Sequence, residues 1–212
     1  MTIHIKICGF TTVDGVKAAV EAGVDSVGFV LDPSPRQLTI EQANALAAHV
    51  PDSIQTVAVC GRPSVAEVQE IWEHMRPDWI QLMSDAHPGH AAGLPIIPAF
   101  EDGADLVDRV SAYVAGITDP DPLILADGPK PGSGIVADWD RVRGIARTHR
   151  LMIAGGLTPE NVGTAIERLG PWAVDVSSGV EQSPGVKSPE KIRAFVEAVR
   201  RAERSVETKN ED

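Results

Sequence analysis

The stretch that decides the fold is residues 150–180, which read RLMIAGGLTPENVGTAIERLGPWAVDVSSGV. Its apolar runs at 150–154 and 172–176 predict two strands, because strands covered on both faces are apolar almost throughout. Between them, residues 159–169 predict a helix with Thr158 as its N-cap. Two strands joined by one helix predict a parallel pair with a right-handed crossover.

The same alternation of strand and helix runs through the whole chain. Short apolar runs predict strands at 3–8, 26–31, 54–59, 78–82, 95–99, 122–126, 150–154 and 172–176. Helical periodicity predicts helices at 12–22, 39–49, 64–75, 104–115, 138–148, 159–169 and 189–204. Repeated strand–helix units of this kind predict an α/β protein with a closed (β/α)₈ barrel, the TIM barrel. An open doubly wound sheet is the alternative, but CGFTTVDG after the first strand lacks the G-x-G-x-x-G fingerprint of that fold.

Local signals set the domain limits and several helix starts. Thr39 with Gln42 has the spacing of a capping box, and Ser188 with Pro189 repeats the N-cap and proline pattern of Thr158 and Pro159. Residues 1–204 are expected to form the single barrel domain. The polar residues 205–212 are expected to form a tail without fixed structure. The segment 83–94, which Pro and Gly interrupt, predicts only a short or irregular helix.

The composition narrows the class of partner. The net charge is −11, which argues against nucleic acid and anionic membranes but leaves room for a small anionic substrate. No apolar run approaches a membrane span, and the N-terminus shows no signal peptide. The two cysteines make no disulfide framework, so we expect a cytoplasmic protein. No long exposed apolar stripe is evident, which favours a monomer.

Two glycine-rich loops follow the last two strands. Gly155 and Gly156 come after the seventh strand, and Ser177, Ser178 and Gly179 come after the eighth. Loops at these positions often bind phosphate in such barrels, because their backbone N–H groups can approach an anion closely. The alternative is that these glycines only make tight turns from strand to helix.

Cys8 and Asp127 are the candidate acid–base pair. Each ends a strand, and the first and sixth strands lie across the barrel mouth from one another. A thiol can serve as a base when a nearby positive charge favours the thiolate, and Lys6 points to the same side of the strand as Cys8. The alternatives are a core thiol for Cys8 and a loop cap for Asp127. Arg36, after the second strand, could bind a carboxylate bidentately or could be a solvated loop arginine.

The histidines give no sign of a metal site. The six histidines show neither H-x-x-x-H nor H-E-x-x-H spacing. His87 and His90 lie close together but without carboxylate or cysteine support. We therefore expect no bound metal.

Taken together, these motifs resemble one enzyme family, the phosphoribosylanthranilate isomerases. They occur in the family order from the first strand to the last helix, so the resemblance covers nearly the whole chain. The matching stretches are IKICGFTT (5–12), AGVDSVGFVLDPSPRQLTIEQA (22–43), DWIQL (78–82), LILADGPKPGSG (123–134), IAGGLTPENV (153–162) and VDVSSGVEQSPGVKSPEKIRAFV (174–196). The resemblance implies a barrel of the ribulose-phosphate-binding type.

The resemblance also implies a reaction and residue roles. The family performs an Amadori rearrangement of N-(5-phosphoribosyl)anthranilate, a phosphosugar substrate, in tryptophan biosynthesis, without metal or organic cofactor. The aspartate matching Asp127 is the general acid that protonates the ring oxygen, and the cysteine matching Cys8 is the general base at carbon 2 of the sugar. The arginine matching Arg36 binds the anthranilate carboxylate, and the glycine and serine loops bind the phosphate. Lys6 and Gln81 are also expected to be substrate-binding residues.

Three stretches depart from the family pattern. They are VCGRP at 59–63, Met83-Ser84 after Gln81-Leu82, and the segment 135–139, which reads IVADW. All three stretches lie on the substrate side of the barrel. Arg62, which belongs to the first of them, is a cation near the barrel mouth and could partly replace a lost substrate contact. Two alternatives stay open: a related isomerase acting on another phosphosugar amine, and a catalytically weak barrel that only binds phosphate.

Overall fold

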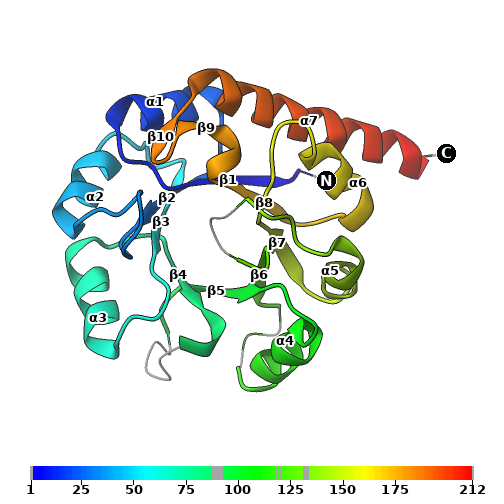
Figure 1. The fold of residues 1–212 in the computed structure, drawn as a ribbon, viewed down its shortest axis with the longest axis horizontal. Coiled ribbons are helices and arrows are strands. Elements are labelled where there is room, and N and C mark those ends of the chain that lie inside the picture. Colours follow the sequence, from blue (N-terminus) through cyan, green and yellow to red (C-terminus); the bar gives the residue numbers. More distant parts are fainter. Residues whose placement is uncertain (1, 87–92, 118, 120, 131–133, 212) are drawn as a thin grey trace.

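Eight parallel strands pair in chain order and close into a barrel. In Figure 1 the strands form a ring. The computed structural model describes residues 2–86, 93–117, 119, 121–130 and 134–211. Helices cover the outside of the ring in Figure 1. The predicted TIM barrel is confirmed, and the open doubly wound sheet is excluded.

The elements follow the predicted order. The strands of the barrel are β1 His4–Cys8, β2 Ser26–Val30, β3 Gln55–Val59, β4 Trp79–Met83, β5 Ile96–Glu101, β6 Leu123–Asp127, β7 Arg150–Ile153 and β8 Ala173–Val176. The helices are α1 Val13–Ala22, α2 Ile40–Ala47, α3 Val65–His74, α4 Leu106–Ala115, α5 Trp139–Ala146, α6 Val162–Leu169 and α7 Pro189–Glu211. Two 3₁₀ turns, η1 Ser84–Ala86 and η2 Ser178–Val180, and a hairpin of β9 Glu181–Ser183 with β10 Val186–Lys187 complete the described structure.

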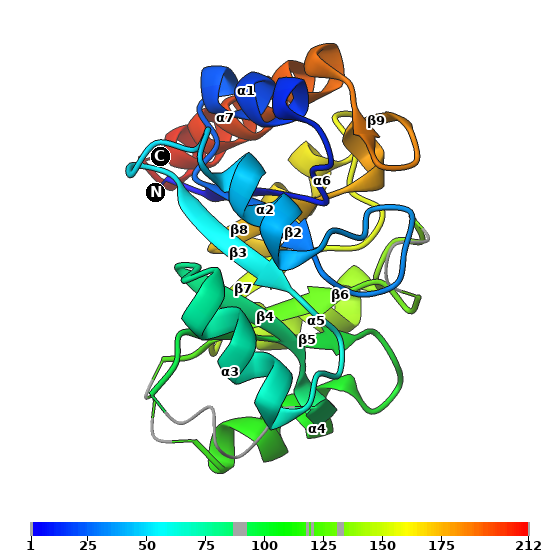
Figure 2. The ribbon, with the colours of Figure 1, turned by 90° about the vertical axis from the view of Figure 1, so that its left-hand side faces the viewer.

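The barrel closes where the first strand meets the last. β1 pairs with β8 in a register that places Lys6 beside Asp175. The two chain ends lie at the opposite end of the barrel from β9 and the loop after β2, on the left in Figure 2. There, the guanidinium of Arg200 donates to the carbonyl oxygen of Ile3 at 2.8 Å. α7 packs against both α1 and α6 on the outside of the seam.

The alternation of each strand divides the core into two layers. One set of strand side chains fills the barrel interior, including Val57, Leu125 and Met152. The other set faces the helices, where Ile5 and Phe195 are fully buried. Because both faces of the strands are covered, the strands read as the nearly continuous apolar runs seen in the sequence.

Helix boundaries agree with the sequence at most ends and differ at two. The capping box of Thr39 and Gln42 is present at α2. α6, however, begins at Val162 rather than at residue 159. The side chain of Asn161 accepts a hydrogen bond from the backbone N–H of Thr158 and donates one to the carbonyl oxygen of Gly156, which forms a turn in place of the first helical residues.

The last helix also differs from its predicted end. α7 continues to Glu211, past residue 204, where the sequence predicts the start of an unstructured tail. The added residues read SVETKNE and include two Glu and one Lys, which favour helix without needing to be buried. Within the segment 83–94, η1 is the short helix that the structure describes, and His87 and His90 lie outside the described residues. Across the described part of the chain, no helix combines the length and the apolarity needed to cross a membrane.

Candidate active site

A cavity of about 450 Å³ opens at the carboxyl ends of the barrel strands. Eight of the residues predicted for the site line it: Cys8, Arg36, Gln81, Asp127, Gly155, Gly156, Ser177 and Ser178. Lys6 and Gly179, which the sequence also placed at the site, do not line the cavity. The barrel thus brings residues from six different strands or strand-end loops to one hollow.

Asp127 is the last residue of β6 and lines the cavity. Its Oδ1 accepts a hydrogen bond from the backbone N–H of Gly128 at 2.7 Å. Although the side chain is partly accessible from the cavity, burial is the largest influence on it and raises the pKa of Asp127 to about 6. The charge of Asp175 adds to this rise, while the hydrogen bond from Gly128 opposes it. A carboxyl of this kind can hold a proton close to neutral pH.

Cys8 is the last residue of β1 and is a buried, free thiol. Gly28 on β2 makes room for it, because a Cβ at Gly28 would lie 3.0 Å from the Cys8 Sγ. Burial is the largest influence on Cys8 and raises the pKa of its thiol, while the positive charge of Lys6 is the largest influence that lowers it. The sequence left the direction of this shift open, and in the structure burial outweighs the lysine.

Lys6 lies below the cavity rather than in its wall. Its side chain is completely buried, and its Nζ donates to the Oδ2 of Asp175 at 3.0 Å. The ion pair provides the partner that a lysine inside a barrel needs. The second carboxylate oxygen, Asp175 Oδ1, is buried and has no hydrogen-bond partner among the described residues, and Asp175 lines the cavity. The sequence analysis missed Asp175; its one signal is a lone carboxylate in the apolar strand AVDV.

Gln81 brings a further free polar group to the cavity. It lies on β4 and is 8% exposed, and its Oε1 is buried with no hydrogen-bond partner in the part of the chain that the structure describes. A buried acceptor without a partner carries a free-energy cost of about 1–3 kcal/mol. A ligand that donates a hydrogen bond there would remove this cost.

The glycines after β7 allow the loops of β6 and β7 to touch. Gly155 has φ +78°, and a Cβ there would lie 2.6 Å from Gly128 Cα and 2.9 Å from Asp127 Oδ1. Gly156 packs in the same way against the backbone of Gly134 and Val136. Both glycines are therefore needed for close packing, and both also line the cavity. The two interpretations offered by the sequence, tight turns and an anion site, fit the same residues.

Gly179 has a packing role. A Cβ at this position would clash with the backbone carbonyl of Leu157. Gly179 therefore lets the loop after β8 approach the loop after β7, while Ser177 and Ser178 face the cavity.

Arg36 reaches the cavity from the loop after β2. Its Nε and Nη2 donate to Oε1 and Oε2 of Glu181 at 2.7 and 2.8 Å, so it is not a solvated loop arginine. Lys187 Nζ also donates to Glu181 Oε1, at 2.9 Å. The sequence analysis missed Glu181 and Lys187, because no spacing rule connects a hairpin after β8 with a loop after β2.

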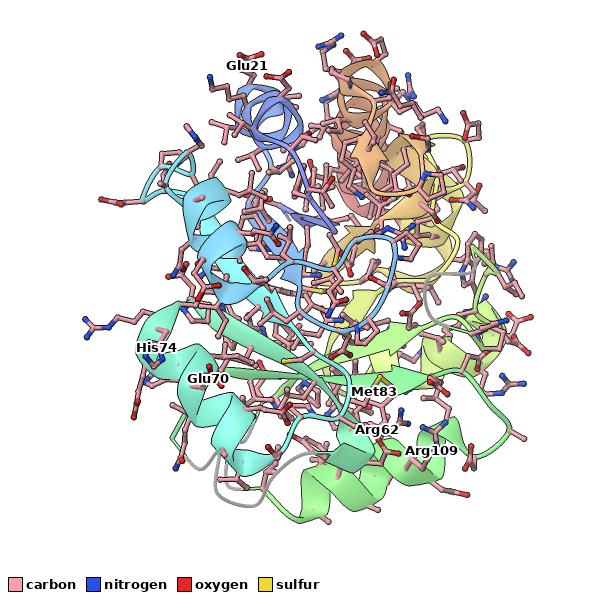
Figure 3. All side chains as sticks on the ribbon, turned by 60° about the vertical axis from the view of Figure 1, so that its left-hand side comes forward. Glu21, Arg62, Glu70, His74, Met83 and Arg109 are labelled. Carbon is pink, nitrogen blue, oxygen red and sulfur yellow. The ribbon has the colours of Figure 1, made fainter. Side chains whose placement is uncertain are left out.

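Arg62 does not line the mouth cavity. It lines a neighbouring cavity of about 340 Å³ between the second and third strand–helix units, and it pairs with Asp85 at 3.0 Å. Both side chains of this pair are more than half exposed. Figure 3 shows Arg62 near Met83, whose backbone N–H donates to the carbonyl of the adjacent Gly61. The structure gives no support to Arg62 as a replacement substrate contact.

Comparison with known proteins shows which family this chain resembles in sequence. Residues 5–198 match the family model described as N-(5'phosphoribosyl)anthranilate (PRA) isomerase. The N-(5'-phosphoribosyl)anthranilate isomerase of Roseiflexus sp. (strain RS-1) is 40% identical over 216 residues, which cover 94% of this chain and 99% of that protein.

Two solved structures are also similar. The first is phosphoribosyl anthranilate isomerase in complex with reduced 1-(o-carboxyphenylamino)-1-deoxyribulose 5-phosphate, with 29% identity, a TM-score of 0.81, and coverage of 94% of this chain and 99% of that one. The second is a structure of monomers of the dimeric phosphoribosylanthranilate isomerase from Thermotoga maritima, with 28% identity, a TM-score of 0.81 and the same coverage.

Proposed function

Because the chain belongs to the N-(5'-phosphoribosyl)anthranilate isomerase family, we propose that Asp127 and Cys8 catalyse the family reaction as general acid and general base. The observation that carries this proposal is that both groups line one cavity together with Arg36 and the two glycine–serine loops. The complex of a relative with a reduced carboxyphenylamino-deoxyribulose phosphate supports a ligand of the same chemistry here: a phosphosugar that carries a carboxylated ring.

Asp127 starts the reaction in this scheme. With a pKa of about 6, roughly one Asp127 carboxyl in ten is protonated at pH 7. It gives its proton to the furanose ring oxygen of the substrate, the bond between carbon 1 and that oxygen breaks, and the nitrogen lone pair forms a protonated imine. An ordinary aspartate would hold far less of the proton at this pH, so burial adapts the group to its role.

Cys8 completes the reaction in this scheme. Its thiolate removes the proton from carbon 2, and the electron pair of that C–H bond neutralises the imine and gives an enolamine. The enolamine then tautomerises to the ketone. Lys6 supports this step, because its buried charge opposes the effect of burial on the thiol.

The remaining polar groups bind the ends of the substrate. Arg36 takes the anthranilate carboxylate, and the loops at Gly155-Gly156 and Ser177-Ser178 take the phosphate. Gln81 Oε1 and Asp175 Oδ1 remain as acceptors inside the cavity. The open sugar carries hydroxyl donors, so we assign these two acceptors to its hydroxyl groups.

A fluorescence assay tests the proposal. Phosphoribosylanthranilate is generated in situ, and the loss of its anthranilate fluorescence is followed with wild-type protein, Cys8→Ser and Asp127→Asn. Each substitution is expected to lower kcat by about 10²–10⁴-fold, the usual contribution of a positioned acid or base. If both well-folded variants kept the wild-type rate, the assigned roles would be wrong.

We further propose that the protein is a monomer. The exposed large hydrophobic side chains of the described residues are Val107, Ile135 and Val136, and such scattered residues do not make an obligate interface. Light scattering after gel filtration is expected to give a mass near the 22.5 kDa of one chain. A mass of twice that value would instead place the protein with the dimeric relative from Thermotoga maritima.

A further inference from the structure

Only one edge of the Arg36 guanidinium forms hydrogen bonds with the described residues of the protein. The side-on edge, Nε with Nη2, is taken by the two carboxylate oxygens of Glu181. Among the described residues, the end-on edge of Nη1 and the second hydrogen of Nη2 has no hydrogen-bond partner in the structure. Arg36 lines the cavity, whereas the buried Glu181 does not. The edge bound to Glu181 therefore faces the protein, and the end-on edge is left for a ligand in the cavity. One arginine can thus bind two carboxylates, one on each edge.

Lys187 fixes Glu181 from the other side. Its Nζ donates to Glu181 Oε1 at 2.9 Å, to the carbonyl oxygen of Ser177 at 3.1 Å and to Ser177 Oγ at 3.3 Å. The three hydrogens of the ammonium group match these three acceptors, and the side chain is 1% exposed. Glu181 is therefore held between two cations, and neither cation is free to turn away.

The backbone around this cluster leaves little freedom for Arg36. Gly9, with φ +82°, gives the side chain its space, because a Cβ there would clash with Arg36 Cδ and would lie 3.1 Å from Ser177 Oγ. Gly185, in the turn between β9 and β10, would bring a Cβ to 2.8 Å from the carbonyl oxygen of Pro35. In Figure 2, β9 and the loop after β2 lie on the same side of the barrel.

Glu181 stays ionised in this setting. Burial alone would raise the pKa of its carboxyl, but the hydrogen bond from Arg36 and the charge of Lys187 lower it further than burial raises it. The carboxylate and the guanidinium therefore keep their charges, which makes the bidentate pair a strong and directional one.

We propose that Glu181 is a positioning residue, which holds Arg36 so that its free end-on edge meets the carboxylate of the substrate. This inference rests on the proposed role of Arg36 as the carboxylate site. It predicts that Glu181 affects only substrates that carry the carboxylate, and only while Arg36 is present. A role limited to the stability of the hairpin would affect every substrate equally.

The test compares two substrates and four proteins. The substrates are phosphoribosylanthranilate and the adduct of aniline with ribose 5-phosphate, which lacks the carboxylate. The proteins are wild type, Glu181→Gln, Arg36→Met and the double variant, each checked for folding by circular dichroism. A matched control is Glu190→Gln, which removes the same charge from an exposed pair with Arg193 on α7.

The expected result is a loss that depends on the carboxylate. Glu181→Gln lowers kcat/KM for phosphoribosylanthranilate about 10- to 100-fold, mainly through KM, as expected for a misplaced charge-assisted hydrogen bond. The same variant changes kcat/KM for the aniline adduct by less than about threefold. In the Arg36→Met background, Glu181→Gln adds no further loss, because the residue that it positions is gone. Glu190→Gln behaves as wild type.

Two results would overturn the inference. Equal losses on both substrates would assign Glu181 to the stability of the hairpin, and additive losses in the double variant would show that it does not act through Arg36. A separate failure belongs to the proposed function: if Arg36→Met lost the same factor on both substrates, Arg36 would not be the carboxylate site at all.

Discussion

At the residue scale, the environment of each polar group determines its chemistry. Asp127 and Asp175 are both aspartates at the carboxyl end of the barrel. At Asp127, burial and the charge of Asp175 outweigh the hydrogen bond from Gly128 and the charge of Lys6, and the pKa rises to about 6. Asp175 is instead bound to Lys6 at 3.0 Å. A carboxyl with a pKa of about 6, such as that of Asp127, is suited to donate a proton near neutral pH.

The raised pKa values predict the pH profile of kcat/KM. In the proposed mechanism, the reaction needs Asp127 protonated and Cys8 deprotonated. Below about pH 6, Asp127 stays protonated while the thiolate fraction falls, so the rate falls with decreasing pH. Between the two pKa values the opposite trends cancel and give a plateau, and above the raised thiol pKa the loss of the Asp127 proton lowers the rate.

Asp127→Asn separates this explanation from a general pH effect on the fold. With no acid to titrate, the small remaining activity depends on the thiolate alone and is expected to rise with pH through the whole range up to the thiol pKa. Initial rates from pH 5 to 10 measure this. If the rate of the variant still reached a plateau near pH 6, the change in slope there would belong to another group.

At the element scale, the loops after β6 and β7 support each other through a glycine contact. Gly155→Ala would place a Cβ against the backbone of Gly128 at a positive φ, so it should lower the free energy of unfolding by about 2–4 kcal/mol. It should also lower kcat, because the same Cβ crowds Asp127 Oδ1. Urea unfolding and initial rates measure the two effects.

Gly144→Ala is the matched control. Gly144 lies in α5, and a Cβ there would meet nothing within 4 Å. The substitution should raise stability by about 0.5–1 kcal/mol, because alanine favours helix over glycine. If Gly155→Ala were as harmless as Gly144→Ala, the glycine would not be needed for the loop contact.

The elements were predictable where the pattern is local. Each barrel strand was predicted within two residues of its observed ends, since a strand buried on both faces leaves an apolar run in the sequence. The start of α6 was not predicted correctly. The side chain of Asn161 forms hydrogen bonds with the backbone of the preceding residues, and these bonds compete with helix formation.

The site was predictable only in part for a related reason. Cys8 and Asp127 stand at strand ends next to glycines, and Arg36 stands in the loop after the second strand, all of which a sequence shows. Glu181 and Asp175 act through partners 145 and 169 residues away, and no local pattern encodes such pairs. Lys6 was identified as needing a partner, but the sequence could not say which one.

At the scale of the whole molecule, the ion pair of Lys6 and Asp175 joins the first and last strands. Lys6→Met alone should lower the free energy of unfolding by about 3–5 kcal/mol, because it leaves Asp175 buried without its cation. The double variant Lys6→Met with Asp175→Asn should recover most of that loss, since it leaves no unpaired charge. Urea unfolding of wild type, both single variants and the double variant measures the effect. A double variant as unstable as the sum of the two single variants would show that the charges do not interact.

The closing seam also has a consequence for synthesis of the chain. Lys6 and Asp175 are 169 residues apart, so roughly 10 to 30 seconds separate their appearance at ordinary rates of translation. During that interval β1 has only β2 beside it, and its other edge is open to pairing with another chain. The buried ammonium has no partner until β8 emerges, and Glu181 follows later still. The catalytic end of the barrel is thus completed only after β8 and the β9–β10 hairpin have been synthesised.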